Sequence, residues 1–199
     1  MPFRRARISV GILGGSFNPP HAGHYHVAYQ AKKRLGLNRV YFLVSPQNPL
    51  KSDSIAGTIG SRFLATKDVI SKRMNQFGAM RPSSIESLFK SSYTSNTMKR
   101  LRLMHPETKF IWLMGADNLH QFHKWHKWRD VINNHHVSIL DRRCDAMRPA
   151  SNKLSYLYPN KHVTNTVLRN RAKPCSWSFF KIKRIDMSST MLRAKPTIT

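Results

Sequence analysis

Acidic residues and cysteines are both scarce in this chain of 199 residues. Nine Asp and Glu stand against 34 Lys and Arg, which gives a formal net charge of +25 at pH 7. Such a balance favours polyanionic partners, so nucleotides, nucleic acids and anionic membrane surfaces are all candidates. The few carboxylates form no paired cluster in the sequence. A magnesium cage made wholly of protein side chains is therefore not expected, because Mg²⁺ binds oxygen ligands.

The two cysteines, Cys144 and Cys175, do not form a CxxC pair and are too few for a disulfide framework, which favours a reducing compartment. Long apolar runs are missing as well, since no stretch approaches the roughly 18 apolar residues of a membrane-spanning helix. The Arg-rich start and the apolar run at 8–13 lead directly into a Gly/Pro/His loop, without the cleavage region of a signal peptide. We therefore expect a cytoplasmic protein that does not enter a membrane.

Length and composition predict a single domain over residues 1–199, since a chain with 40% hydrophobic residues can bury one sizeable core. The expected strands are residues 8–13, 40–44, 84–88, 110–114, 136–140 and 179–185. The expected helices are residues 23–35, 61–74, 96–104 and 128–133, with a helical turn from 188. This alternation predicts an α/β fold, a Rossmann-like, doubly wound, mainly parallel sheet with helices on both faces. The segment at about 141–178, rich in Pro, Asn and Arg, is expected to form irregular loops.

A block rich in glycine and histidine, GGSFNPPHAGH at 14–24, follows the first expected strand. Glycines directly after a parallel strand let backbone amides approach a phosphate closely, and a helix N-terminus adds partial positive charge. His21 and His24 lie three residues apart at the helix entrance, so both imidazoles can point at the same anion. The block is neither a Walker loop nor a GxGxxG turn. We favour a triphosphate cradle over an ordinary turn or a zinc pair, for which the sequence offers no obvious third ligand.

This block resembles the GxFxPxHxGH signature of the nucleotidyltransferase superfamily, and it is similar to the sequence of bacterial nicotinate mononucleotide adenylyltransferases. A second block, SSTMLR at 188–193, resembles that family's S-[ST]-T-x-[IL]-R element. Hydroxyls at a helix start can cap free amides or donate to phosphate, and Arg193 adds a charged fork. Alone, this block fits an ordinary helix cap; together the two blocks indicate a triphosphate site.

Further segments extend the resemblance over nearly the whole chain. Gly115 and Asp117 follow an expected strand, where parallel sheets bind their ligands, and the resemblance implies that they contact the adenylate ribose. It also implies that Trp125 stacks on the pyridine ring. The segment YTSNT at 93–97 resembles the family's TYTxDT element beside the pyridine carboxylate, with Asn96 where the family usually has an acid.

Two loops carry weaker matches to the same family. Lys51 lies in the loop after the second expected strand, where relatives have a basic residue facing the mononucleotide; a solvated lysine is the alternative. Arg142 keeps the arginine of an Arg-Pro-Gly element, whereas Arg143 and Cys144 replace the proline and the glycine. Trp128 fits a core helix better than a binding site, because its neighbours are apolar at helical spacing.

The expected site has three groups of residues. The catalytic residues are His21, His24 and Arg193. The ATP-binding residues are Gly14, Gly15, Ser16, Phe17, Gly115, Asp117, Arg142, Ser188, Ser189 and Thr190. The mononucleotide-binding residues are Asn18, Lys51, Thr94 and Trp125. No metal site made by the protein is expected.

The resemblance implies adenylyl transfer from ATP to nicotinate mononucleotide in NAD biosynthesis, giving nicotinate adenine dinucleotide and pyrophosphate. A phosphate monoester is mostly a dianion at neutral pH, because its second pKa is about 6. No general base is then required, and positioning and charge stabilisation supply the catalysis. Mg²⁺ is expected to bind through the ATP phosphates and to keep several waters.

Other functions stay open at this point. Within the superfamily, the acceptor could be another phosphorylated molecule such as phosphopantetheine, although the tryptophan block and the chain length favour the pyridine nucleotide. A basic nucleic-acid-binding module would explain the charge, but the chain has no reader motif and its charges are scattered. An inactive scaffold is disfavoured because both phosphate-binding blocks are intact. A homo-oligomer is compatible with the sequence; specific nucleic acid and membrane partners are not expected.

Overall fold

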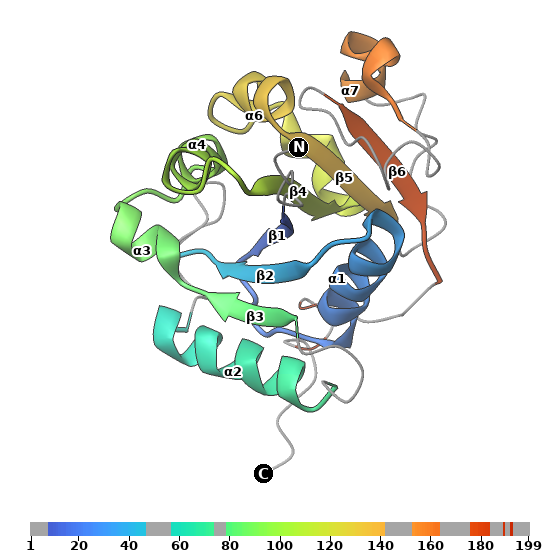
Figure 1. The fold of residues 1–199 in the computed structure, drawn as a ribbon. Helices are drawn as coiled ribbons and strands as arrows, with labels where there is room; N and C mark the ends of the chain where they lie inside the picture. Colours follow the sequence, from blue (N-terminus) through green and yellow to red (C-terminus); the bar gives the residue numbers. More distant parts are fainter. Residues whose placement is uncertain are drawn as a thin grey trace, which may run out of the picture.

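The computed structural model describes residues 8–46, 57–73, 79–141, 153–163 and 176–183, together with Ser189 and Leu192. Its centre is a six-stranded sheet in the order β3-β2-β1-β4-β5-β6 (Figure 1). The strands are β1 Ser9–Gly15, β2 Arg39–Val44, β3 Met80–Ser83, β4 Lys109–Gly115, β5 His136–Asp141 and β6 Trp177–Lys181. All five neighbouring pairs are parallel. The predicted Rossmann-like, doubly wound sheet is therefore confirmed.

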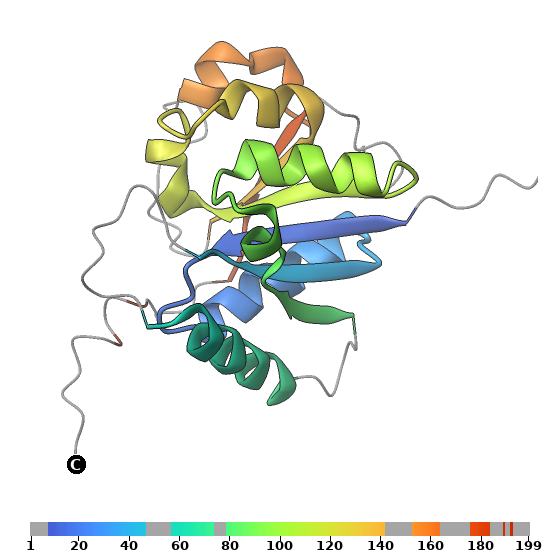
Figure 2. The ribbon, with the colours of Figure 1, turned by 90° about the vertical axis from the view of Figure 1, so that its left-hand side faces the viewer.

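Helices cover both faces of this sheet, α4 and α6 on one side and α1 and α2 on the other (Figure 2). The α-helices are α1 Ala22–Leu35, α2 Ile59–Ser71, α3 Ile85–Phe89, α4 Thr94–Met104, α5 Leu119–Phe122, α6 Trp128–Asn134 and α7 Lys153–Leu157. Two 3-10 turns, η3 Ala116–Asn118 and η5 Pro159–Lys161, complete the set of described elements. Within the part of the chain that the structure describes, no helix has the length and apolarity to cross a membrane.

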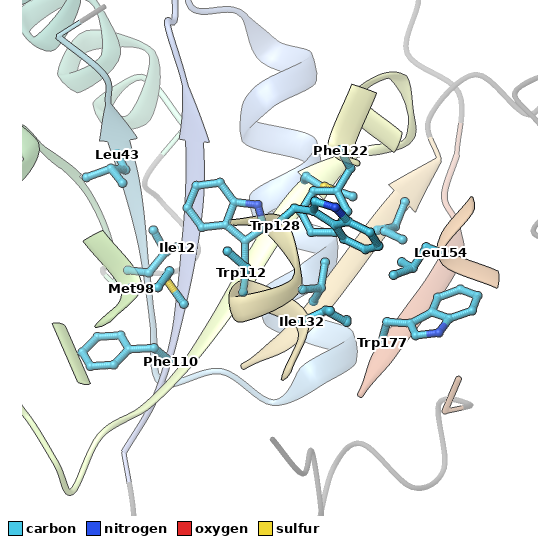
Figure 3. Packing of buried hydrophobic residues seen from close by; sticks show 14 of the residues in the cluster. Ile12, Leu43, Met98, Phe110, Trp112, Phe122, Trp128, Ile132, Leu154 and Trp177 are labelled. Atoms are coloured by element: carbon cyan, nitrogen blue, oxygen red, sulfur yellow. The ribbon is translucent and has the colours of Figure 1, made fainter. Parts of the chain in front are cut away.

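Each face of the sheet has its own hydrophobic cluster. On the α4 and α6 face, Trp112, Trp128 and Ile132 pack together, with Trp177 at the β6 end (Figure 3). Trp128 is only 8% exposed and its ring contacts Phe122, which confirms it as a core residue. The other cluster lies between the sheet and the buried faces of α1 and α2. The site described below lies where the loops leave this two-layered core.

Three local predictions were wrong. Residues 84–88 are not a strand: β3 ends at Ser83, and α3 follows because Glu86 and Phe89, three residues apart, are both buried. The last strand lies at Trp177–Lys181 rather than at 179–185. The segment at 141–178 is not wholly irregular, since α7 forms there and buries Leu154. In each case the pairing or packing partner lies far away in the sequence, where local patterns do not reach.

Candidate active site

The strand order reverses between β1 and β4, and this reversal defines the candidate site. From β1 the chain continues to β2 on one side, whereas β4 lies on the other side of β1 and leads toward β5. Ligands of open parallel sheets bind beyond the carboxyl ends of the strands at such a switch point. The loops that follow Gly15 of β1 and Gly115 of β4 therefore border the expected crevice.

Glycines at both strand ends make room for neighbouring side chains. A Cβ atom at Gly14 would overlap the indole ring of Trp112, and one at Gly115 would overlap the carboxylate of Asp117. Asp117 is exposed, and its carboxylate folds back against the end of β4. A larger residue at either strand end would therefore displace the neighbouring side chain.

The loop after β1 is fixed by Phe17, whose φ of 45° lies in the left-handed region. Its ring is 1% exposed and contacts the rings of His24 and Phe42, with centroids 5.0 and 5.7 Å apart. The side chain therefore belongs to the core, and only the Phe17 backbone can reach a ligand. Ser16 and Asn18, on either side of it, are partly exposed.

His21 and His24 are joined to the start of α1 in a reciprocal cap. His21 Nδ1 accepts a hydrogen bond from the backbone N–H of Gly23 at 3.1 Å, and His24 Nδ1 accepts one from the backbone N–H of His21 at 3.2 Å. The two rings lie 3.8 Å apart between centroids, at an angle of 35°. Because each Nδ1 accepts, the proton of each neutral imidazole is on Nε2. Both histidines can therefore act as hydrogen-bond donors without gaining charge.

The C-terminal block reaches the loop after β1. Ser189 Oγ donates a hydrogen bond to the backbone carbonyl of Pro19 at 2.8 Å, across 170 positions of the sequence. A second contact, 3.0 Å between His26 Nε2 and the Lys183 carbonyl, joins α1 to the segment after β6. The two blocks that the sequence singled out separately thus meet in space. Five predicted site residues lie outside the described part of the chain: Lys51, Arg142, Ser188, Thr190 and Arg193.

The predicted mononucleotide contacts Thr94 and Trp125 are brought near each other by the rings of their neighbours. Tyr93, the residue before Thr94 and α4, contacts the ring of His126, with centroids 4.5 Å apart. The Trp125 ring is held edge-on by Trp112, with centroids 5.9 Å apart and an angle of 85°. Trp125 is only partly buried, so part of its ring stays accessible. This end of the site is aromatic, whereas the α1 end is rich in backbone amides and imidazoles.

Asn96, which replaces the acid of the related motif, has a local role. Its Nδ2 donates to Ser91 Oγ at 3.2 Å, which ties the first turn of α4 to the segment before it. The replacement therefore leaves the start of α4 in place, beside Tyr93 and Thr94.

Arg62 on α2 and Glu86 on α3 are buried charged residues that the sequence alone did not single out; they are 4% and 3% exposed. Burial lowers the pKa of Arg62 and raises the pKa of Glu86. In the sequence, the only signal for Arg62 is its position in a stripe with Thr66 and Ile70, at a spacing of four residues. Among the described residues, no three His, Cys, Asp or Glu side chains gather as a metal site would require.

Comparison with known proteins gives results that agree with this geometry. The model of the cytidylyltransferase-like family matches residues 12–195. A relative from Cereibacter sphaeroides, named "Probable nicotinate-nucleotide adenylyltransferase", is 37% identical over 185 residues, which cover 93% of this chain and 96% of the relative. A relative of the same name from Agrobacterium fabrum is 36% identical over 187 residues, which cover 92% of this chain and 97% of the relative.

Among solved structures, the chain is similar to "Plasmodium falciparum nicotinic acid mononucleotide adenylyltransferase complexed with NaAD". The TM-score is 0.68 and the sequence identity 16%, over 94% of this chain and 82% of that one. At this identity the likeness concerns the fold, and it agrees with the parallel sheet described above.

Proposed function

Because the chain belongs to the family of nicotinate-nucleotide adenylyltransferases, we propose that it transfers the adenylyl group of ATP to nicotinate mononucleotide, a step of NAD biosynthesis. The products are nicotinate adenine dinucleotide and pyrophosphate. The observation that carries this proposal is the hydrogen bond from Ser189 to Pro19, which joins the two phosphate-binding blocks at one strand end. A triphosphate needs donors from several directions, and two blocks that meet can provide them.

The proposed reaction is an in-line displacement at the α-phosphorus of ATP. An oxygen of the mononucleotide phosphate forms the new bond to this phosphorus, the bond to the bridging oxygen breaks, and pyrophosphate leaves with the electron pair. His21 and His24 donate Nε2–H to the phosphate oxygens at the positive end of the α1 dipole. Arg193 is assigned to the same task, the stabilisation of negative charge on the phosphate oxygens. Such preorganised donors stabilise negative charge as it develops, and the dianionic phosphate needs no base.

The remaining residues divide between the two substrates. We assign Gly14, Gly15, Gly115 and Asp117 to ATP, because they line the ends of β1 and β4. Ser16 and the backbone of Phe17 join them, together with the hydroxyl of Ser189 and with Arg142, Ser188 and Thr190. Asn18, Lys51 and Thr94 are assigned to the mononucleotide.

Trp125 is assigned to the pyridine ring. Its ring is fixed in place by Trp112 and stays partly exposed. Stacking of a flat heterocycle on such a ring contributes about 1–3 kcal/mol.

Magnesium is proposed to enter with ATP rather than to be held by a protein cage. The only carboxylate that we place in the site is the exposed side chain of Asp117, and Mg²⁺ often binds through one or two carboxylates plus substrate phosphates. The ion would neutralise charge on the ATP phosphates.

We place the enzyme in the cytoplasm, in keeping with only two cysteines in the chain.

The test is pyrophosphate release from ATP and Mg²⁺ with three acceptors in parallel: nicotinate mononucleotide, nicotinamide mononucleotide and phosphopantetheine. We expect release with nicotinate mononucleotide, and the product identified by mass as the dinucleotide. Release with phosphopantetheine alone would keep the chemistry but reject the acceptor. No release with any of the three, by protein with a native circular dichroism spectrum, would reject the proposed reaction.

A further inference from the structure

Arg62 makes an unusual set of hydrogen bonds for a buried arginine. Its guanidinium donates to four backbone carbonyls: Gly57 at 2.9 Å from Nε, Ser16 and Ser45 at 2.8 and 2.7 Å from one terminal nitrogen, and Pro46 at 2.9 Å from the other. Among the described residues, no carboxylate lies within ion-pair distance of it. Within the described residues, the positive charge is therefore balanced by peptide dipoles.

The carbonyls that Arg62 binds lie where two neighbouring strands end. Ser16 is the first residue after β1, and Ser45 and Pro46 are the first two after β2. The two strands are parallel partners, and the backbone N–H of Ser45 donates to the Gly15 carbonyl at 3.1 Å. A single nitrogen of Arg62 thus bridges the beginnings of the two loops.

A second buried charged residue, Glu86, contacts the same strand end. Glu86 forms a side-chain hydrogen bond with Ser45 and accepts one from Thr97 Oγ1 at 2.8 Å. Thr97 lies on the first turns of α4, three residues after Thr94. The hydrogen bonds therefore form a chain from the loop after β1 to Arg62 and Ser45, and from Ser45 through Glu86 to α4. This chain connects the two ends of the site that are assigned to the substrates.

Removing a charged group from water is unfavourable, and burial accordingly lowers the pKa of Arg62. An apolar residue at this position would avoid that cost, but it would leave four backbone carbonyls without the donor that Arg62 supplies. The planar fork has a different advantage, because its nitrogens reach several acceptors at fixed angles. Lysine, with one nitrogen, cannot span the same four carbonyls.

We propose that Arg62 is a positioning residue for adenylyl transfer, which sets the separation of the loops after β1 and β2 without touching either substrate. This inference rests on the proposed function. The loop after β1 carries residues assigned to the triphosphate. Ser45, at the end of β2, is linked through Glu86 and Thr97 to α4, which begins at Thr94, a residue assigned to the mononucleotide. The separation of the two strand ends then decides whether the attacking oxygen lines up with the α-phosphorus. A misplacement of about 1 Å can lower turnover by about 100-fold.

The experiment compares Arg62→Lys and Arg62→Ala with Lys67→Ala, an exposed residue of the same helix. The readouts are kcat, KM for each substrate, the melting temperature, and rescue of Arg62→Ala by millimolar guanidinium, with methylammonium as the control ion. We expect kcat to fall by about 100-fold in both Arg62 variants and KM for the mononucleotide to rise. Guanidinium should raise the kcat of Arg62→Ala at least tenfold, whereas methylammonium should not. The kcat of Lys67→Ala should stay within twofold of that of the unchanged protein.

Two results would overturn the inference. One is an Arg62→Lys protein that keeps kcat and both KM values and only melts earlier, which would make the role structural. The other is a folded Arg62→Ala protein whose turnover guanidinium does not raise. If Arg62→Ala does not fold, the kcat and KM values of Arg62→Lys decide alone. Failure of the proposed function is separate, because the unchanged protein and Lys67→Ala would then also release no pyrophosphate.

Discussion

Two buried histidines at the start of β5 should make the protein lose stability in mild acid. His136 is 1% exposed, and its Nδ1 and Nε2 lie 2.7 and 3.0 Å from the hydroxyls of Ser176 and Ser178. Ser178 in turn donates to the hydroxyl of Ser138 at 3.1 Å. The neighbouring His135 is 6% exposed. A proton added to either ring would place a charge in the core without a counter-ion from these partners.

Burial lowers the pKa of His135 to about 4 and the pKa of His136 to about 3, and the charges of Arg102 and Lys109 act in the same direction. Both values lie below 6.5, the pKa of a histidine in an unfolded chain. Above pH 6.5 both states are neutral and the stability is complete. As the pH falls below 6.5, the unfolded chain gains protons that the folded state cannot take up, until the folded pKa is reached. At pH 5 each histidine therefore removes about 2 kcal/mol, and the pair about 4 kcal/mol.

Urea unfolding at pH 7.5 and pH 5.0, followed by tryptophan fluorescence, measures this loss. Against a total stability of about 5–15 kcal/mol, a loss of about 4 kcal/mol is large. His135→Gln and His136→Gln should each lose about 2 kcal/mol less between the two pH values than the unchanged protein. Comparison of variants is needed because the raised pKa of Glu86 acts in the opposite sense. The exposed His105→Gln serves as the control. An equal pH dependence in all four proteins would refute the reasoning.

Three further changes test the site. His24→Ala should lower kcat by about 100- to 1,000-fold, while the loss of its cap bond costs only about 1 kcal/mol of unfolding free energy; full activity would remove His24 from the phosphate contacts. Trp125→Ala should raise KM for the mononucleotide about 5- to 150-fold and leave KM for ATP unchanged, because stacking contributes about 1–3 kcal/mol. Gly115→Ala should raise KM for ATP, since the added Cβ displaces the Asp117 carboxylate; Gly60→Ala, whose Cβ would only make an ordinary contact with Thr58 Oγ1 at 3.9 Å, is its control.

The parts of the fold that local patterns decide were predictable from the sequence. Strands β1, β2, β4 and β5 are short apolar runs bounded by glycine, proline or polar residues, as buried parallel strands are. The end of α1 at Gly36 was predictable too, because the left-handed cap at φ 62° favours glycine. The β3–α3 region was not, since a run of five residues fits a strand or a helix until its packing partners are known.

The same limit applies to the candidate site. The block at 14–24 is contiguous, so a phosphate-binding role could be predicted from its own residues, and its likeness to a family added the substrates. The contact of Ser189 with Pro19 spans 170 positions, and no spacing rule predicts it. Between these two residues in the sequence lies β6, which pairs with β5 at the edge of the sheet.

Arg62 shows why the remaining part of the site lay beyond sequence patterns. Arginine is almost never fully buried without a partner, so a basic residue on a helix predicts a solvated face. The partners here are carbonyl groups, which every residue has and which therefore leave no trace in the sequence. Two strand ends must first lie side by side before their carbonyls form an acceptor set that fits a guanidinium. The charge on α2 is thus explained by the geometry of β1 and β2, whose ends supply the carbonyl acceptors.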